Sequence, residues 1–298
     1  NEKFVEVRVL ERGTILADVE GGEVRTMDIS LIETSVEGER LVLGGYSDGK
    51  LKLWRHSRSI FELVAETEGL GKCVLSVEVE KVVVAGGERT LLISGQSDGR
   101  LSIRDLTSRV TSPLSFALLW KKPGIDPSTS FLLRYSFIDP RKKSALLPVP
   151  FFVSSPHQSG INGLSVSSRE STLIVATAGD ANAVSVASIE LSEIEGKLGV
   201  SVSRSTILAD AHGSTIQGLD FLSPTLLASS SVEQRLNFYS LDSTTTSPHL
   251  QLIHSTCLDV ADCSAQDIVR AERGKGEEWK VLVAGIGMEV VDASMDAV

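Results

Sequence analysis

Short runs in which apolar and polar residues alternate recur along this chain, mostly in pairs around a turn. The clearest pair is LVLGGYSDGKLKLW at residues 41–54 and LLISGQSDGRLSIR at residues 91–104. In each, an apolar strand reaches a Ser-Asp-Gly turn and a second alternating strand follows. Strict alternation over such short runs predicts β-strands, and the turn glycine predicts hairpins. We therefore expect a chain built mainly from strands.

The Ser-Asp-Gly turns are the strongest repeat signal. Asp48 and Asp98 stand 98 − 48 = 50 residues apart, and Gly49 and Gly99 follow them directly. An Asp side chain in such a turn can accept a backbone N–H, and glycine can adopt the positive φ that the turn needs. Weaker copies occur at residues 172–188, 225–241 and 279–292. In the copy at residues 172–188, Asn182 stands where the turn glycine would be. Five hairpins are therefore expected.

An alternating run precedes each hairpin, and a further strand candidate, such as residues 60–66 or 131–137, follows most of them. Four short strands per unit with almost no helical periodicity predict the blades of a β-propeller. We expect an all-β fold of four-stranded antiparallel blades, about five of them recognisable. The last unit lacks a fourth strand, and residues 4–10 (FVEVRVL) are a strand without a partner. Pairing of the two would close the ring and remove exposed sheet edges.

We expect residues 1–298 to form a single propeller domain. The chain begins at Asn1 rather than Met, which suggests a piece of a longer chain. A long insertion, rich in Pro and Ser, is expected at about 107–158. Its basic side chains, interleaved with aromatic residues, are candidates for contact with RNA or a protein partner. They are Lys121, Lys122, Arg134, Arg141, Lys142 and Lys143. The simpler interpretation, which we favour, is a solvated loop whose aromatic residues belong to a blade strand.

Charge and composition narrow the classes of partner. The 29 Lys and Arg residues against 39 Asp and Glu residues give a net charge of −10, which argues against broad binding of a phosphate backbone by this chain alone. No apolar run is long enough for a membrane-spanning helix, so no membrane contact is expected. Three scattered cysteines and the absence of a secretory leader indicate reduced thiols and a cytoplasmic location.

Two histidines connect the pattern to a known family. His157 and His212 each precede an alternating run, and Tyr239 follows His212 by 239 − 212 = 27 residues. This arrangement resembles the WD-repeat family, in which a His, a strand Ser or Thr, a turn Asp and a terminal Trp form a structural hydrogen-bond relay. The resemblance implies a relay of His212, Ser229 and Tyr239, with Glu233 in the place of Asp. The repeats are degenerate, since Trp54 is followed by Arg rather than Asp.

The last third of the chain carries a closer resemblance. AHGSTIQGLDFLSPTLLASSSVEQRLNFYSLD, then a DVAD segment and VLVAGIGMEVVD, are similar to the extreme C-terminus of the WD-repeat protein six family. That resemblance implies a non-catalytic scaffold subunit that supports a tRNA 2'-O-ribose methyltransferase acting on the wobble nucleotide. Members of the family are long chains with several propellers, so the resemblance also implies that this chain is a C-terminal fragment of a multi-propeller protein. The partners would be the catalytic subunit and, through the complex, tRNA. S-adenosylmethionine would bind the catalytic partner, so no cofactor is expected here.

Two alternative functions stay open. A generic WD-repeat scaffold in a signalling or trafficking complex has the same composition. The other is a propeller hydrolase with a site in its central channel. The G-x-S-x-G matches at Ser47 and Ser97 resemble a nucleophile elbow, but we expect them to be strand-to-strand turns because the motif is duplicated within the repeat. A hydrolase would also need acidic, His or Ser side chains at the inner strand ends, whereas the visible Asp residues occupy turns. No metal site is expected, since Cys257 and Cys263 are about 20 Å apart along an extended strand.

Overall fold

The computed structural model describes residues 24–34, 39–57, 60–69, 71–110, 145–194, 196–242, 249–271 and 278–294. These residues form five sheets, which we call blades 1 to 5 in chain order. Blade 1 contains β1 (Thr26–Glu33), β2 (Glu39–Tyr46), β3 (Leu51–Ser57), β4 (Ile60–Glu66) and β8 (Ala145–Leu146). Blade 2 contains β5 (Val74–Val84), β6 (Gly87–Gln96), β7 (Leu101–Asp105) and β9 (Phe152–Ser154). The short helix α1 (Thr107–Val110) follows β7.

The second half of the chain repeats the pattern without inserted elements. Blade 3 contains β10 (Ile161–Arg169), β11 (Thr172–Gly179), β12 (Val184–Ile194) and β13 (Lys197–Leu208). Blade 4 contains β14 (Ile216–Ser223), β15 (Leu226–Ser231), β16 (Arg235–Asp242) and β17 (His249–Cys257). Blade 5 contains β18 (Ala261–Ala271) and β19 (Glu278–Ser294). The predicted all-β fold of antiparallel blades is confirmed, and among the described strands only β8 pairs in parallel, with β4.

In blade 5 the chain reverses direction within β19, in addition to the turn between β18 and β19. Lys280 Nζ lies 2.5 Å from Asp292 Oδ1, although both residues belong to β19. Twelve residues of extended strand would separate them by about 40 Å, so the chain must turn back between them. Gly287 has a φ of +114°, a value open to glycine, at the point where the sequence predicts the fifth hairpin turn.

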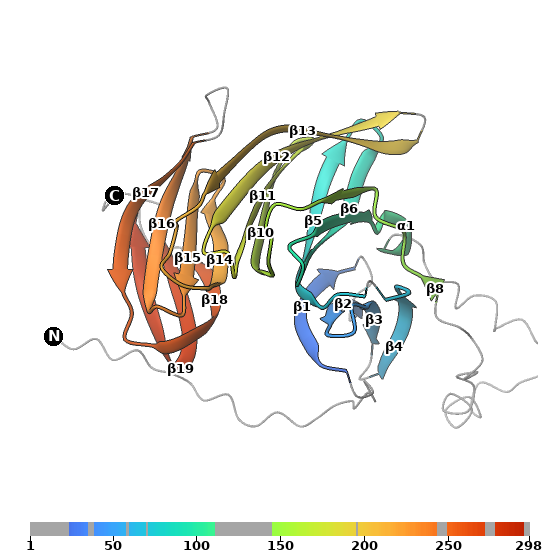
Figure 1. Ribbon diagram of the computed structural model, residues 1–298. Coiled ribbons are helices and arrows are strands. Elements are labelled where there is room, and N and C mark those ends of the chain that lie inside the picture. Colours follow the sequence, from blue (N-terminus) through green and yellow to red (C-terminus); the bar gives the residue numbers. More distant parts are fainter. Residues whose placement is uncertain are drawn as a thin grey trace, which may run out of the picture.

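The blades follow one another around an arc, with blade 1 (blue) and blade 5 (red) at its ends (Figure 1). Their inner strands pack in the order β1, β5, β10, β14 and β18. Within the described residues, neither β18 nor β19 makes a comparable contact with β1, so the two end blades do not pack together. The strand at residues 4–10, which was expected to close the ring, lies outside the described residues.

The hydrophobic core consists of four clusters, one at each junction between consecutive blades. Glycines at these junctions allow the sheets to approach closely. A Cβ on Gly95 would lie 2.7 Å from Ile161 Cγ2 of the next blade, and one on Gly163 would lie 2.8 Å from Leu219 Cβ. Apolar residues of each inner strand thereby fill space that the preceding blade leaves open, so burial couples neighbouring blades.

The C-terminal part of the expected insertion belongs to the propeller. Residues 145–146 extend the edge of blade 1 as β8, and β9 is the fourth strand of blade 2. The alternating run at residues 131–137, a candidate for a fourth strand, lies outside the described residues, and β9 fills that place in blade 2. The six basic candidates for RNA or partner contact also lie outside the described residues.

Candidate functional site

Polar side chains inside blade 4 form a continuous hydrogen-bonded chain. His212, in the loop before β14, places Nε2 2.7 Å from Ser229 Oγ on β15, and a 3.1 Å hydrogen bond joins this hydroxyl to Tyr239 OH on β16. On the other side of the ring, His212 Nδ1 lies 2.7 Å from Glu233 Oε1. Burial lowers the pKa of His212, so the imidazole is neutral at pH 7 and Nδ1–H donates to the carboxylate. Glu233 therefore occupies the place of the family's turn Asp.

Asn237 is a member of this relay that sequence reasoning missed. It pairs with Ser229 across the strands β15 and β16. Its Nδ2 donates to the carbonyl of Ala211 at 2.9 Å and to Tyr239 OH at 3.2 Å. The amide therefore ties the histidine loop to the sheet a second time. The alternation of RLNFYSL, which places Asn237 and Tyr239 on one face, was the available signal.

The relay shortens in blade 3. His157 Nε2 lies 2.9 Å from Thr177 Oγ1, and burial lowers the pKa of this histidine as well. Thr177 pairs with Ser185, so the position that Tyr239 occupies in blade 4 falls on Ala187 here. Alanine has no polar atom in its side chain, and the chain of hydrogen bonds ends at the threonine.

Blade 2 replaces the terminal Trp by a buried arginine. Arg104 is 1% exposed, and its Nη1 donates to Ser102 Oγ at 2.7 Å, which is itself 2.8 Å from Ser94 Oγ. Burial lowers the pKa of Arg104 to about 10, and Nε has no hydrogen-bond partner within the described residues. In blade 1, by contrast, Trp54 Nε1 donates to Tyr46 OH at 3.1 Å.

The Ser-Asp-Gly turns join one blade to the next. Gly49 and Gly99 have φ values of +80° and +79°, and Asn182 has a φ of +58° at the matching position. A Cβ on Gly99 would lie 2.1 Å from the carbonyl oxygen of His157, in the loop that precedes blade 3. In the same way, His212 N donates to the carbonyl of Asn182 at 3.2 Å. The turns at Gly99 and Asn182 therefore contact the histidine loop of the following blade, and the turn at Gly49 approaches Lys72 in the loop that precedes blade 2.

This geometry also places the two G-x-S-x-G matches. Ser47 lies between β2 and β3, and Ser97 lies between β6 and β7, so a strand follows each turn. The backbone N–H of Ser97 donates to the carbonyl of Cys73 at 2.9 Å. A nucleophile elbow presents its serine on a turn from a strand into a helix. Asp48 Oδ1 accepts the backbone N–H of Lys50 at 2.9 Å, which is a turn-stabilising bond.

The sequence analysis missed three acidic residues on inner strands, because it considered Asp only in turns. Asp28 Oδ2 accepts the backbone N–H of Val77 at 2.7 Å, and Asp220 Oδ2 accepts from Gln266 Nε2 at 2.9 Å. Each bond crosses from one blade to the next. Burial, followed by the charges of Asp220, Glu80 and Asp28, raises the pKa of Glu78 to about 8.

Burial likewise raises the pKa of Asp220 to about 6. Acidic residues alternating with apolar ones in DIS, VEVE and LDF were the available signal. In all three cases a carboxyl group on one inner strand lies against the neighbouring blade, so these groups connect blades. In the part of the chain that the structure describes, no three His, Cys, Asp or Glu side chains are arranged to hold a metal ion.

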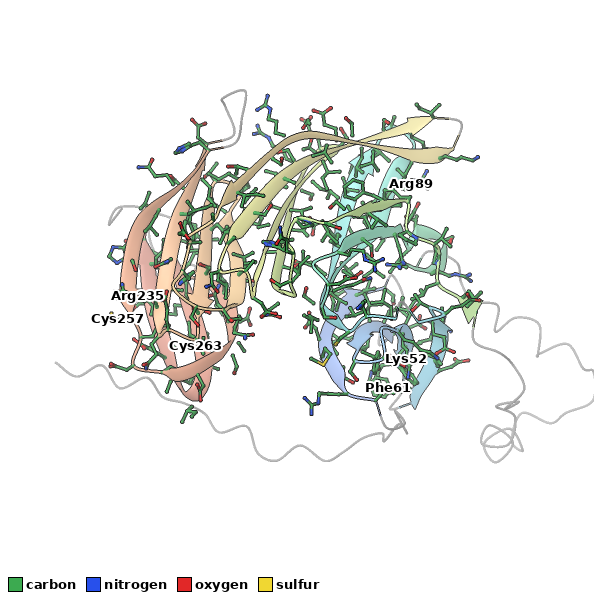
Figure 2. All side chains as sticks on the ribbon, viewed as in Figure 1. Lys52, Phe61, Arg89, Arg235, Cys257 and Cys263 are labelled. Atoms are coloured by element: carbon green, nitrogen blue, oxygen red, sulfur yellow. The ribbon has the colours of Figure 1, made fainter. Side chains whose placement is uncertain are left out.

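The cysteines of the last two blades differ in exposure. Cys257, at the end of β17, is exposed, whereas Cys263 on β18 is buried and its thiol contacts the carbonyl of Val260 at 3.2 Å (Figure 2). No helix in the described ranges has the length and apolar character needed to cross a membrane.

Two long hairpins carry exposed apolar side chains near their ends. The β5–β6 hairpin of blade 2 and the β12–β13 hairpin of blade 3 are joined by a salt bridge of 2.7 Å between Arg89 Nη2 and Glu193 Oε2. Val83 and Ile194, close to the ends of these hairpins, are largely exposed. Two hairpins joined at their ends and carrying exposed apolar side chains form a candidate protein interface.

Comparison with known proteins connects this architecture to named relatives. The chain is 29% identical over 234 residues to the tRNA (34-2'-O)-methyltransferase regulator WDR6 of Pongo abelii, a match that covers 74% of this chain and 19% of that protein. The human WDR6 is 28% identical with the same coverage, and that of Bos taurus is 26% identical over 281 residues, covering 90% of this chain and 23% of the relative. The chain thus spans about a fifth of the length of these relatives. No model of a protein family matches the chain.

A solved structure supports the fold independently. The crystal structure of Saccharomyces cerevisiae Sqt1 superposes with a TM-score of 0.55 at 12% identity, covering 91% of this chain and 59% of that one. The resemblance to the WD-repeat protein six family is therefore confirmed: this chain is a WD-repeat β-propeller similar to a part of the WDR6 proteins.

Proposed function

We propose that this chain is a non-catalytic scaffold, part of a regulator subunit for a methyltransferase that modifies the 2'-oxygen of nucleotide 34 in tRNA. The observation that carries the proposal is the sequence similarity over most of the chain to proteins named as regulators of that enzyme. The polar groups of the described residues support it, because they form bonds within and between blades. A rigid second surface lowers the entropic cost of bringing a flexible RNA arm to the catalytic subunit.

Binding to the catalytic subunit is the first test. The purified chain is titrated against the purified methyltransferase by isothermal calorimetry, and a bovine serum albumin titration serves as the negative control. We expect saturable binding and, in a tRNA methylation assay, a higher rate of 2'-O-methylation at nucleotide 34. Absence of both effects at concentrations where the chain is folded would leave a scaffold of another assembly as the better interpretation.

The candidate interface is tested by charge insertion. Val83→Asp and Ile194→Asp together place two carboxylates on the apolar edge of the long hairpins, whereas Val202→Asp changes an exposed apolar residue elsewhere on β13. If the hairpin edge contacts the methyltransferase, the double variant loses affinity and the control does not. An equal loss for the control would mean that the effect is general.

RNA contact through the insertion is tested by the dependence of binding on salt. Replacing Arg141, Lys142 and Lys143 by Ala should reduce the slope of log affinity against log salt by about 2 to 3, at roughly 0.7 to 0.9 for each lost phosphate contact. A control variant replaces three exposed lysines elsewhere, Lys81, Lys197 and Lys280. An unchanged slope in the first variant would assign tRNA binding to another part of the complex.

A further inference from the structure

The polar relay of blade 2 contains a cation, whereas the relay of blade 4 ends on a carboxylate. In blade 4, Ser229 pairs with the residue two places before Tyr239. In blade 2, Ser94 pairs with the residue two places before Arg104, so the arginine takes the place of the tyrosine. The chain of hydrogen bonds in blade 4 ends on Glu233, but no carboxylate among the described residues pairs with Arg104.

The buried polar cluster of blade 2 has more hydrogen-bond donors than acceptors. Arg104 Nη1 donates to Ser102 Oγ at 2.7 Å, and this oxygen lies 2.8 Å from Ser94 Oγ. Each serine has one O–H, and only one of the two can be accepted within the pair. The other hydroxyl hydrogen and Arg104 Nε–H have no acceptor among the described residues. All three side chains are at most 2% exposed, so bulk water does not supply these acceptors.

Neighbouring groups of blade 2 do not supply the missing acid. In the turn, Asp98 Oδ2 accepts Arg100 Nε at 2.8 Å, and Oδ1 accepts the backbone N–H of the same residue. Residues 67–73, which precede β5, contain no histidine, so this loop offers no imidazole to bridge Ser94 and the turn. Gln96 is buried and its Oε1 has no hydrogen-bond partner; rotation of the amide would present its NH2 group as one more donor.

We propose that the Arg104 cluster, formed by Arg104, Ser94 and Ser102, binds a small monovalent anion such as chloride between blades 1 and 2. An anion accepts N–H and O–H groups and donates none, so it supplies both missing acceptors. It also supplies the counter-charge that a buried guanidinium needs. Arg104 carries this charge at neutral pH, since its pKa of about 10 lies well above 7. A water molecule could accept the same donors but would leave the charge unbalanced.

The dependence of unfolding on chloride tests the proposal. Urea unfolding of the whole chain is measured at constant ionic strength while sodium gluconate, whose anion is too large for a buried site, is replaced by sodium chloride. For a dissociation constant of about 10 mM, raising chloride from about 10 to about 300 mM increases the folding equilibrium constant about 15-fold. We expect an increase of this order for the parent and none for Arg104→Leu.

Two further variants separate specific binding from a general effect of salt. Arg235→Leu is the matched control, because it removes the same charge from an exposed position on β16 and should keep the chloride dependence of the parent. Ser94→Ala removes one donor and leaves the charge of Arg104 in place. It should show a weaker chloride dependence than the parent, and it keeps the test decisive if Arg104→Leu does not fold. In gluconate, Arg104→Leu should be at least as stable as the parent.

Crystals of the parent grown in sodium bromide would locate the ion, because bromide scatters anomalously and replaces chloride. We expect an anomalous peak beside Arg104 Nε. A folding equilibrium constant that does not respond to chloride, or an equal response in the parent and in Arg104→Leu, would overturn the proposal. Bromide peaks only on the surface, which would mark adventitious ions only, would also overturn it and leave a buried water as the acceptor.

Discussion

Glu78 offers the sharpest test of how burial between blades affects stability. It lies on the inner strand β5, and its carboxyl group is surrounded by the like charges of Asp220 on β14, Glu80 on β5 and Asp28 on β1. The backbone N–H of Val166 is the one group that favours the charged form. Glu78→Gln keeps an oxygen that can accept this N–H and removes the ionisable proton.

The size of the effect follows from the raised pKa. The pKa of Glu78 rises from 4.5 to about 8, so the folded state holds the proton more tightly than the unfolded state. The contribution of Glu78 to stability is therefore most favourable below pH 4.5 and is lost as the pH rises through about 8. At 1.36 kcal/mol per pKa unit, the cost of ionisation is roughly 3 kcal/mol at pH 7 and at most about 5 kcal/mol above pH 9.

Urea unfolding at pH 5, 7 and 9 measures this cost. We expect Glu78→Gln to be close to the parent at pH 5 and more stable by a few kcal/mol at pH 9, with a flatter dependence on pH. Glu190→Gln, which removes the same charge from an exposed position on β12, is the control and should change little. A Glu78→Gln variant that is less stable than the parent at pH 9, or that keeps the parent's dependence on pH, would refute the reasoning.

Three further substitutions test the relays and turns. Gly99→Ala should cost at least about 1 to 2 kcal/mol, since alanine is strained at a φ of +79° and its Cβ would meet the carbonyl of His157; thermal unfolding measures the loss, and an unchanged Tm would contradict the close approach. Tyr239→Phe removes the hydroxyl bonded to Ser229 and should cost about 0.5 to 1.5 kcal/mol in urea unfolding, whereas a stabilised variant would argue against the relay. Arg104→Leu should be neutral or stabilising by about 1 to 4 kcal/mol, since it removes a buried guanidinium that is desolvated without a compensating charge; a loss of several kcal/mol in the same assay would show that the guanidinium is needed.

Much of the fold could be predicted from the sequence because its signals are local. Alternation identifies a strand from a few residues, and the positive φ at Gly49, Gly99 and Asn182 follows from turn chemistry within four residues. The relay of His212 and Tyr239 was predicted from a family resemblance, and the structure joins these residues through Ser229.

Other features depend on contacts between segments far apart in the chain, and local patterns do not contain them. Asn237, Glu78 and Asp220 look like ordinary solvent-facing positions of alternating strands. Likewise, Arg104 looks like a surface residue at the end of a strand, although it is buried.

Alternating hydrophobicity and turn residues were thus sufficient to predict the strands, the hairpins and the class of fold, because hydrogen bonding and side-chain direction in a strand are local properties. Which polar groups become buried, and which apolar face remains uncovered, was decided only when the blades packed. Burial depends on the space between two neighbouring sheets. Glu78 is buried among groups from other blades, whereas Ile29 is exposed because no described blade packs against it.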